Sequence, residues 1–222
     1  MKLVATLPME ILALADTVFR TPRVLKAKNP KDQQYRRIQV YLMNRSLRFY
    51  QASLGLCDRG LGMEAIPLFR AIYELGLTAQ YLKTDPERLP QRLLDRAIVD
   101  QKDMVVAMKV APEEFKQGIE GRDEKEQAVF SEFTKVSDIY KGKTGQIWPE
   151  PSQIAKGVGL SWQHAVLYGQ MNEVAHPSLR VIHMFMALED GGGLRIIDPP
   201  PTAHSGSFSI ATGIMFSHMA TH

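Results

Sequence analysis

Residues 65–82 carry only two charged side chains among 18 positions, and this restricts the fold more than any other feature of the chain. The two charges are Arg70 and Glu74, four residues apart, so they share one face of a helix. Apolar side chains are distributed around the rest of the circumference. A helix that is apolar on all sides must be surrounded by protein. The sequence therefore predicts that this segment is the central helix of a helical bundle.

The capping residues, prolines and glycines in the rest of the chain also favour helices. Asn29 and Pro30 form an N-cap followed by proline at the first helical position, and a helix is expected from there to Gly60. Apolar residues at alternating steps of three and four predict its packed face: Val40, Met43, Leu47, Tyr50, Leu54, Cys57 and Leu61. Proline, glycine and serine signals place further helices over residues 63–82, 85–107, 112–140, 161–175, with Ser161 as the N-cap, and 178–188.

The expected fold is one all-α domain over residues 1–222, a bundle of five to seven helices. Its core spans about residues 30–190. The glycine- and proline-rich stretch 141–159 is a connector that is too short to separate two domains. Three glycines at 191–193 end the helical region, so residues 191–222 are expected to be an irregular C-terminal extension. Within it, residues 194–197 favour a short strand and 208–218 a terminal helix.

Composition excludes several classes of protein. The single cysteine, Cys57, rules out a disulfide within the chain and a thiolate zinc cage, and it fits a reducing compartment. Pro8 and Glu10 interrupt the apolar residues 3–15, which favours an amphipathic helix over a signal peptide. The charge-free residues 199–222 are rich in proline, serine and glycine, which does not suit a membrane span. We therefore expect a cytoplasmic protein without a membrane partner.

A second polar feature follows near the C-terminal end of the expected bundle. Tyr168, Asn172 and His176 are spaced four residues apart, so on a helix they form one polar stripe. Pro177 directly after His176 places that ring at a helix break. Two interpretations are open for this stripe and for the Arg70 pair. They form either a structural network that sets helix packing or a polar site inside the bundle.

The residues from Met171 to His176 resemble the Arg-Asn-x-x-x-His signature of HEPN-type helical ribonucleases and nucleotide-binding proteins. Asn172 and His176 match that signature, whereas Met171 stands where the family has its arginine. The resemblance implies a helical protein directed at RNA or nucleotides. The histidine in it would take part in catalysis.

Residues 30–200 also resemble a bacterial domain family of unknown function. That family has an Arg-x-x-x-Glu pair in a central helix and a later Tyr-x-x-x-polar-x-x-x-His-Pro segment, with serine the commoner polar residue. The resemblance implies a mostly helical domain and brings no established activity. The matching residues are Arg70, Glu74, Tyr168, Asn172, His176 and Pro177.

No metal and no other cofactor is expected. Glu173 and His176 form one Glu-x-x-His step, but di-metal carboxylate bundles need two such steps and further glutamates. His183 lies seven residues beyond His176 and does not complete a recognised ligand pattern. The chain also has no glycine-rich phosphate loop.

The helix expected after Pro30 is rich in arginine and tyrosine. It presents either a surface that faces phosphates or a solvated face whose tyrosines belong to the core. The residues concerned are Arg36, Arg37, Arg45, Arg48, Tyr35, Tyr41 and Tyr50.

These features lead to one principal hypothesis: a HEPN-like module of the toxin or defence type, directed at RNA or nucleotides and independent of metal. Arg70 would replace in space the arginine missing from the signature and stabilise phosphorane charge, while Glu74 orients it. His176 would act as general base or acid, with Asn172 and Tyr168 donating hydrogen bonds. The alternatives are a non-catalytic interaction module that forms a homodimer through a buried polar network, and a small-molecule sensor.

Overall fold

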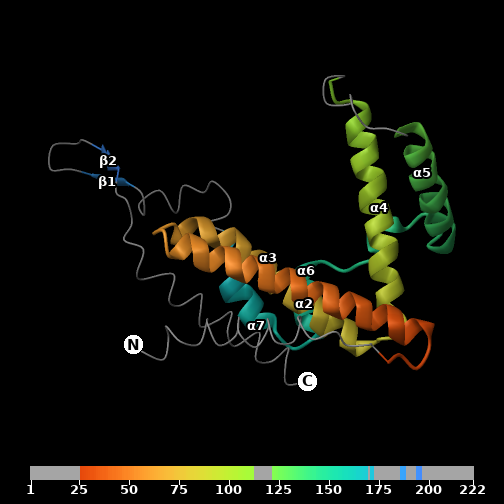
Figure 1. The fold of residues 1–222 in the computed structure, drawn as a ribbon, viewed down its shortest axis with the longest axis horizontal. Helices are drawn as coiled ribbons and strands as arrows, with labels where there is room; N and C mark the ends of the chain where they lie inside the picture. The colour runs from red at the N-terminus through yellow and green to blue at the C-terminus, as the bar shows by residue number, and fades with distance from the viewer. Residues whose placement is uncertain (1–25, 113–121, 170, 173–185, 189–193, 197–222) are drawn as a thin grey trace. The chain divides into compact units, whose positions relative to one another are not determined.

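The computed structural model describes residues 26–112, 122–169, 171–172, 186–188 and 194–196. The chain forms two compact units. Unit 1 contains the residues up to Thr84 and those from Pro151 onward, and unit 2 contains Asp85–Glu150. The described part holds six α-helices and one two-stranded sheet, which confirms the expected all-α class (Figure 1). A single domain over the whole chain stays a prediction.

Unit 1 is built on a hairpin of two long helices, α2 (Pro30–Cys57) and α3 (Gly62–Thr84), which lie side by side in Figure 1. Gln39 Nε2 donates to the carbonyl oxygen of Ala79 at 3.0 Å and so defines the register of the pair. Gly60 closes the connection with a φ of 78°, a left-handed conformation that glycine adopts without strain. The turn therefore allows the two helices to run antiparallel.

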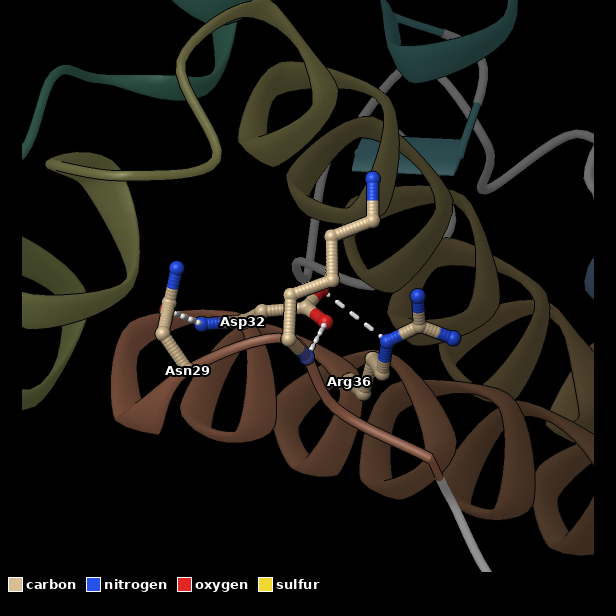
Figure 2. A network of polar contacts seen from close by, with 4 residues as sticks. Asn29, Asp32 and Arg36 are labelled. Atoms are coloured by element: carbon tan, nitrogen blue, oxygen red, sulfur yellow. Dashed lines mark hydrogen bonds and ion pairs between the residues drawn. The ribbon is translucent and has the colours of Figure 1, made fainter.

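The predicted N-cap of α2 is confirmed. Asn29 Oδ1 accepts a hydrogen bond from the backbone N–H of Asp32 at 2.9 Å, and Asp32 Oδ1 accepts from Arg36 Nε at the same distance (Figure 2). The backbone N–H of Lys28 donates to the second Asp32 oxygen at 2.8 Å. This bond, together with Arg36, lowers the pKa of Asp32. A carboxylate in the first turn also complements the helix dipole.

The packed face of α2 differs from the predicted stripe. Val40 and Leu61 are exposed, whereas Ser46 and Ser53 are fully buried. A search for apolar periodicity passes over small serine side chains that a helix also buries, so the predicted stripe is wrong at Val40 and Leu61. Ser53 Oγ donates to the carbonyl oxygen of Phe49 at 2.8 Å, which satisfies that hydroxyl within the helix. The buried residues of α2 are Leu42, Ser46, Leu47, Tyr50 and Ser53.

The prediction that residues 65–82 form a central helix is confirmed. Helix α3 buries nine residues, more than any other described helix, and most of them are almost fully removed from solvent. The buried side chains with a relative exposure of at most 3% are Ala65, Ile66, Phe69, Ile72, Tyr73, Leu77, Ala79 and Leu82.

Two short helices complete the described part of the helical layer in unit 1. Helix α6 (Pro151–Gly157) packs against α3, and α7 (Ser161–Gln163) continues directly into the π-helical turn η3 (His164–Tyr168). The expectation that Ser161 caps this helix is wrong, because Leu160 occupies the N-cap position. The Leu160 N–H bonds back to the carbonyl oxygen of Ala155 at 2.7 Å, so the chain is already turned into the helix at Ser161.

The C-terminal sheet of the described chain is one antiparallel pair, β1 (Met186–Leu188) with β2 (Leu194–Ile196). The predicted strand at 194–197 is confirmed over β2. The expected helix over 178–188 is wrong at residues 186–188, because β2 supplies backbone partners that favour an extended conformation there. Residues 173–185 and 208–218, where helices were also expected, lie outside the described residues.

Unit 2 pairs α4 (Leu89–Lys109) with α5 (Arg122–Ile139), followed by the 3-10 turn η2 (Thr144–Gln146). Helix α4 starts later than residue 85, because the Asp85 carboxylate accepts from the backbone N–H of Arg88 at 3.2 Å and holds a turn there. A helix start at Pro112 is not tested, since residues 113–121 lie outside the described chain.

The core of unit 2 surrounds Val99, Val136 and Ile147. Beside it, the buried carboxylate of Asp95 accepts two hydrogen bonds of 2.8 Å, one from Tyr140 Oη and one from Gln91 Nε2. Because both carboxylate oxygens have partners, this buried charge is compatible with a stable core. None of the helices in the described stretches is long and apolar enough to cross a membrane.

We expect Leu77→Ala to lower the free energy of unfolding by about 2–5 kcal/mol, because Leu77 is almost fully buried in α3 and its loss leaves a cavity. The matched control is Leu61→Ala, which truncates an exposed leucine in the turn between α2 and α3. It should lower the free energy of unfolding by less than about 1 kcal/mol. Chemical denaturation followed by circular dichroism measures both. Equal losses would mean that α3 is not the central helix.

Candidate functional site

An arginine inside the most apolar helix organises the candidate site. Arg70 Nε donates to Glu74 Oε1 at 3.0 Å, and Arg70 Nη2 donates to Tyr168 Oη at 2.8 Å. The guanidinium carbon also lies 4.9 Å from the centre of the Tyr168 ring. The side chains of Arg70 and Glu74 remain 25% and 39% exposed. Helix α3 thus presents a paired guanidinium at a place that solvent still reaches.

Aromatic rings from the two segments of this site stack on each other. The rings of His164 and Tyr168 lie 4.5 Å apart at an angle of 20°, and the His164 ring lies 5.8 Å from that of Tyr73. His164 and Tyr168 face the same way because they are four residues apart in the π-helical turn η3. Such π-helical turns are rare and occur often at functional sites. The turn therefore brings an imidazole and a phenol together beside Arg70.

The pKa directions follow from burial and from the Glu74 charge. Burial lowers the pKa of His164, and the nearby Glu74 opposes this in part, so the imidazole is mostly neutral at pH 7. Burial raises the pKa of Tyr168, and Glu74 raises it further through its charge and a hydrogen bond. Burial tends to lower the pKa of Arg70, but the hydrogen bond to Glu74 outweighs it with the help of Tyr168, and the net direction is upward. The site thus combines a permanent cation, a phenol and a neutral base.

Three buried polar atoms at or beside this cluster have no hydrogen-bond partner among the described residues: Tyr73 Oη, His164 Nδ1 and Asn172 Oδ1. Only two other atoms of the described chain, on Ser46 and Lys83, share this property. Buried polar groups in proteins are nearly always paired. Their concentration around one aromatic cluster distinguishes this part of unit 1 from the rest of the described chain.

Most of the site residues expected from sequence can be located. Arg70, Glu74 and Tyr168 lie in contact, so the pair on α3 and the first residue of the later polar stripe come together. Asn172 is partly buried one turn beyond Tyr168, and no bond joins it to the Arg70 group in the described chain. His176 lies outside the described residues.

The Met171 side chain is only 3% exposed. The position that holds arginine in the HEPN signature is therefore a core position in this chain. An arginine there would need buried partners for its charge, whereas a methionine fills the space without that requirement.

His164 and Tyr73 also belong to the site, and neither was expected there from the sequence. A signal for His164 was present, because it precedes Tyr168 by four residues and so extends the stripe of Tyr168, Asn172 and His176 by one more step. Tyr73 had no such signal. Its position three residues after Arg70 suits a core residue equally well, and only the packing of η3 against α3 shows that its ring joins the cluster.

Within the described ranges, no group of three histidine, cysteine, aspartate or glutamate side chains lies close enough to hold a metal ion. Glu173, His176 and His183, the residues weighed as ligands above, fall outside those ranges. Independence of metal therefore stays a prediction.

The fold and site define an all-α protein whose central helix carries a paired arginine beneath stacked aromatic rings. Residues 37–194 match the model of a family described as "Family of unknown function (DUF5677)", and since this is well over half of the chain, the protein belongs to that family. The comparisons with curated proteins and with solved structures gave no match. The expectation of a helical family of unknown function is thus confirmed, and the HEPN likeness stays a prediction.

Two tyrosines, the buried Tyr73 and the half-buried Tyr140, test the description of this site. Tyr73→Phe should leave the free energy of unfolding unchanged or slightly higher, because the removed hydroxyl has no partner in the described chain. Tyr140→Phe in unit 2 should cost about 1.5–3 kcal/mol, because it removes a hydrogen bond to the buried Asp95 carboxylate. Denaturant unfolding of the two variants makes the comparison. A loss at Tyr73 as large as that at Tyr140 would contradict the unpaired hydroxyl.

Stability at alkaline pH should respond to Tyr73 as well. Burial raises the pKa of Tyr73 from 10.0 to about 12, so between these values the unfolded chain releases a proton that the native chain keeps. Stability should therefore be unaffected by this group below pH 10 and fall by about 1.4 kcal/mol per pH unit above it. Unfolding measured from pH 9 to 12 in the wild type and in Tyr73→Phe isolates the effect, since the variant should show a shallower decline. If the free energy of unfolding of the wild type and of Tyr73→Phe declines in parallel with pH, the raised pKa of Tyr73 is ruled out.

Proposed function

We propose that this protein is a HEPN-like module of the toxin or defence type that cleaves RNA without a metal ion. The observation that carries the proposal is the Arg70 guanidinium, bonded to both Glu74 and Tyr168 and still partly open to solvent. A guanidinium held in one orientation by a carboxylate is the group best suited to bind a phosphate and to stabilise the charge that develops on it.

The proposed reaction is transesterification at a phosphodiester. The ribose 2′-oxygen attacks phosphorus as its proton passes to a base, and the 5′-oxygen leaves as it receives a proton from an acid. Arg70 stabilises the charge on the phosphorane, and Tyr168 donates a hydrogen bond to it. The products are a 2′,3′-cyclic phosphate and a free 5′-hydroxyl, so atoms and protons balance. His176 is assigned one of the two proton transfers, and Asn172 a hydrogen bond to the substrate.

The second proton transfer has a candidate in His164. Its imidazole is neutral at pH 7 because burial lowers its pKa, and it stacks on the Tyr168 ring that contacts Arg70. A neutral imidazole is able to accept the 2′-proton, which leaves His176 as the acid for the 5′-oxygen. Two histidines with these opposite duties fit a reaction that needs one base and one acid.

We also propose that the protein acts in the cytoplasm. Its single cysteine, Cys57, suits a reducing compartment. Burial raises the pKa of that thiol, and the charge of Asp58 raises it further, so it is mainly protonated and unreactive at neutral pH.

A second candidate function is a non-catalytic interaction module that forms a homodimer. One observation favours it: the Arg70 guanidinium already has protein partners on two sides, as expected for an ion pair that sets helix packing. A small-molecule sensor is a further alternative, supported by the unpaired buried atoms of Tyr73 and His164. The experiment below separates catalysis from both alternatives.

We expect the wild type to cleave single-stranded RNA in the presence of a chelator, and Arg70→Ala and His176→Ala to lose about two to four orders of magnitude in rate. The matched control is Arg36→Ala, which removes another half-exposed arginine from an ion pair between residues four apart in unit 1. It should cleave RNA at the wild-type rate. Gel analysis of labelled RNA gives the rates, and circular dichroism shows whether each variant is folded.

Two outcomes would replace the enzyme by the interaction module. One is a wild type that cleaves no RNA, together with an Arg70→Ala variant that loses several kcal/mol of stability or dissociates from a dimer to a monomer. The other is full activity in Arg70→Ala, which would remove the guanidinium from the reaction. Activity that disappears on adding the chelator would contradict the metal-independent mechanism.

A further inference from the structure

The outer face of α2 is a continuous basic stripe that the candidate site does not use. Arg37, Tyr41, Arg45 and Arg48 are all exposed, and their steps of three and four residues place them on one side of the helix. The opposite side of α2 carries the buried residues that pack in unit 1. We call the four exposed residues the α2 stripe.

The structure distinguishes the stripe from an ordinary solvated face. Arg36 is neutralised by Asp32 at 2.9 Å, but none of the three stripe arginines has an ion pair among the described residues. From residue 33 to residue 57 the helix contains no aspartate or glutamate at all. Three guanidinium charges therefore lie along one face of α2, and the only carboxylate of that helix, Asp32, is paired with Arg36.

The aromatic residues at the stripe are Tyr41, which is exposed, and Phe49, which contacts Arg45. The Tyr41 side chain is 63% exposed, so most of its ring faces solvent. The Arg45 guanidinium lies 4.5 Å from the centre of the Phe49 ring, which restrains that charge on the helix surface. Exposed aromatic rings among arginines are the combination with which proteins bind single-stranded nucleic acids, since the rings stack on bases and the guanidinium groups pair with phosphates.

The register of the hairpin relates the stripe to the site. Gln39 on α2 is bonded to Ala79 on α3. Moving nine residues toward the turn on each antiparallel helix leads from 39 to 48 and from 79 to 70. Arg48 thus lies at the same level along the hairpin as Arg70. A polymer along α2 would therefore pass unit 1 at the level of the candidate site.

We propose that single-stranded RNA binds along the α2 stripe, with phosphates paired to Arg37, Arg45 and Arg48 and an unpaired base stacked on Tyr41. Arg37 and Arg48 are eleven residues apart, which is about 16 Å of helix and room for several nucleotides. The choice of RNA over other polyanions rests on the proposed function. The requirement for a single strand comes from Tyr41, because only an unpaired base offers a free face for stacking.

The test uses the full chain and a fluorescent 2′-O-methyl RNA of about 12 nucleotides, which has no free 2′-hydroxyl and so cannot be cleaved. Fluorescence anisotropy gives the Kd at several salt concentrations. The variant Arg37→Gln/Arg45→Gln/Arg48→Gln removes three phosphate contacts, so its log–log salt dependence should be about 2 units shallower. Between 50 and 200 mM salt, wild-type binding should thus weaken about 20-fold more than variant binding. Tyr41→Ala should bind at least about 5-fold more weakly.

The control is a variant with the same loss of charge elsewhere, Arg88→Gln/Lys135→Gln/Lys143→Gln, at exposed positions of unit 2. It should retain the wild-type Kd and salt slope. Equal changes in Kd and salt slope for the two triple variants would overturn the proposal that RNA binds along the stripe, because net charge alone would then account for binding. Wild-type binding to duplex RNA, or to vesicles of anionic phospholipid, that equals or exceeds binding to the single strand would also overturn it.

Two substrates separate the proposed RNA cleavage from the proposed RNA binding along the α2 stripe. A dinucleotide substrate is too short to span the stripe, so its cleavage reports on the site alone, whereas the 2′-O-methyl RNA reports on binding alone. RNA binding that depends on the stripe in a protein that cleaves nothing supports the stripe and rejects the nuclease. Dinucleotide cleavage together with RNA binding that is unaffected by the triple variant rejects the stripe.

Discussion

The pairing of Arg70, a charged residue inside the apolar helix α3, determines how α3 and the turn η3 are joined in unit 1. Helix α3 is the most buried of the described helices, and the Arg70 side chain is only 25% exposed, so its guanidinium needs partners for the part of its charge that is removed from water. Glu74 provides one partner from the same helix, and Tyr168 provides the other from a segment almost 100 residues later. The second bond couples the central helix to the turn η3. It thereby brings the His164 and Tyr168 rings to the face of α3 that carries Arg70 and Glu74.

The same physical problem has a different solution in unit 2, and the contrast helps to interpret the site. The buried Asp95 carboxylate receives hydrogen bonds on both oxygens from Tyr140 and Gln91. A fully paired group of this kind is what a structural network requires. Around Arg70, by contrast, solvent still reaches the ion pair, and neighbouring atoms of Tyr73 and His164 lack partners in the described chain. Incomplete pairing in one place and complete pairing in the other suggest different roles.

Helix α2 has one buried face and one exposed basic face. Its inner face buries small residues such as Ser46 and Ser53, and its outer face carries the stripe arginines, which have no ion pair among the described residues. A long helix with both faces in use has little freedom to rotate, because rotation would bury charge on one side and expose core on the other. The hydrogen bond from Gln39 to Ala79 adds a directional contact that sets the register.

Local chemistry was enough to predict the helical class, the Asn29 cap and the central position of residues 65–82, because caps and apolar surface act through neighbouring residues. It was also enough to select Arg70 and Glu74, which interrupt an apolar helix, and Tyr168, which is spaced four residues from Asn172 in a polar stripe. The sequence did not reveal that Ser46 and Ser53 are buried, that residues 186–188 pair as a strand, or that Tyr73 and His164 complete the aromatic cluster. Each of these depends on a partner distant in the chain, and such a partner is defined only when the segments have packed together.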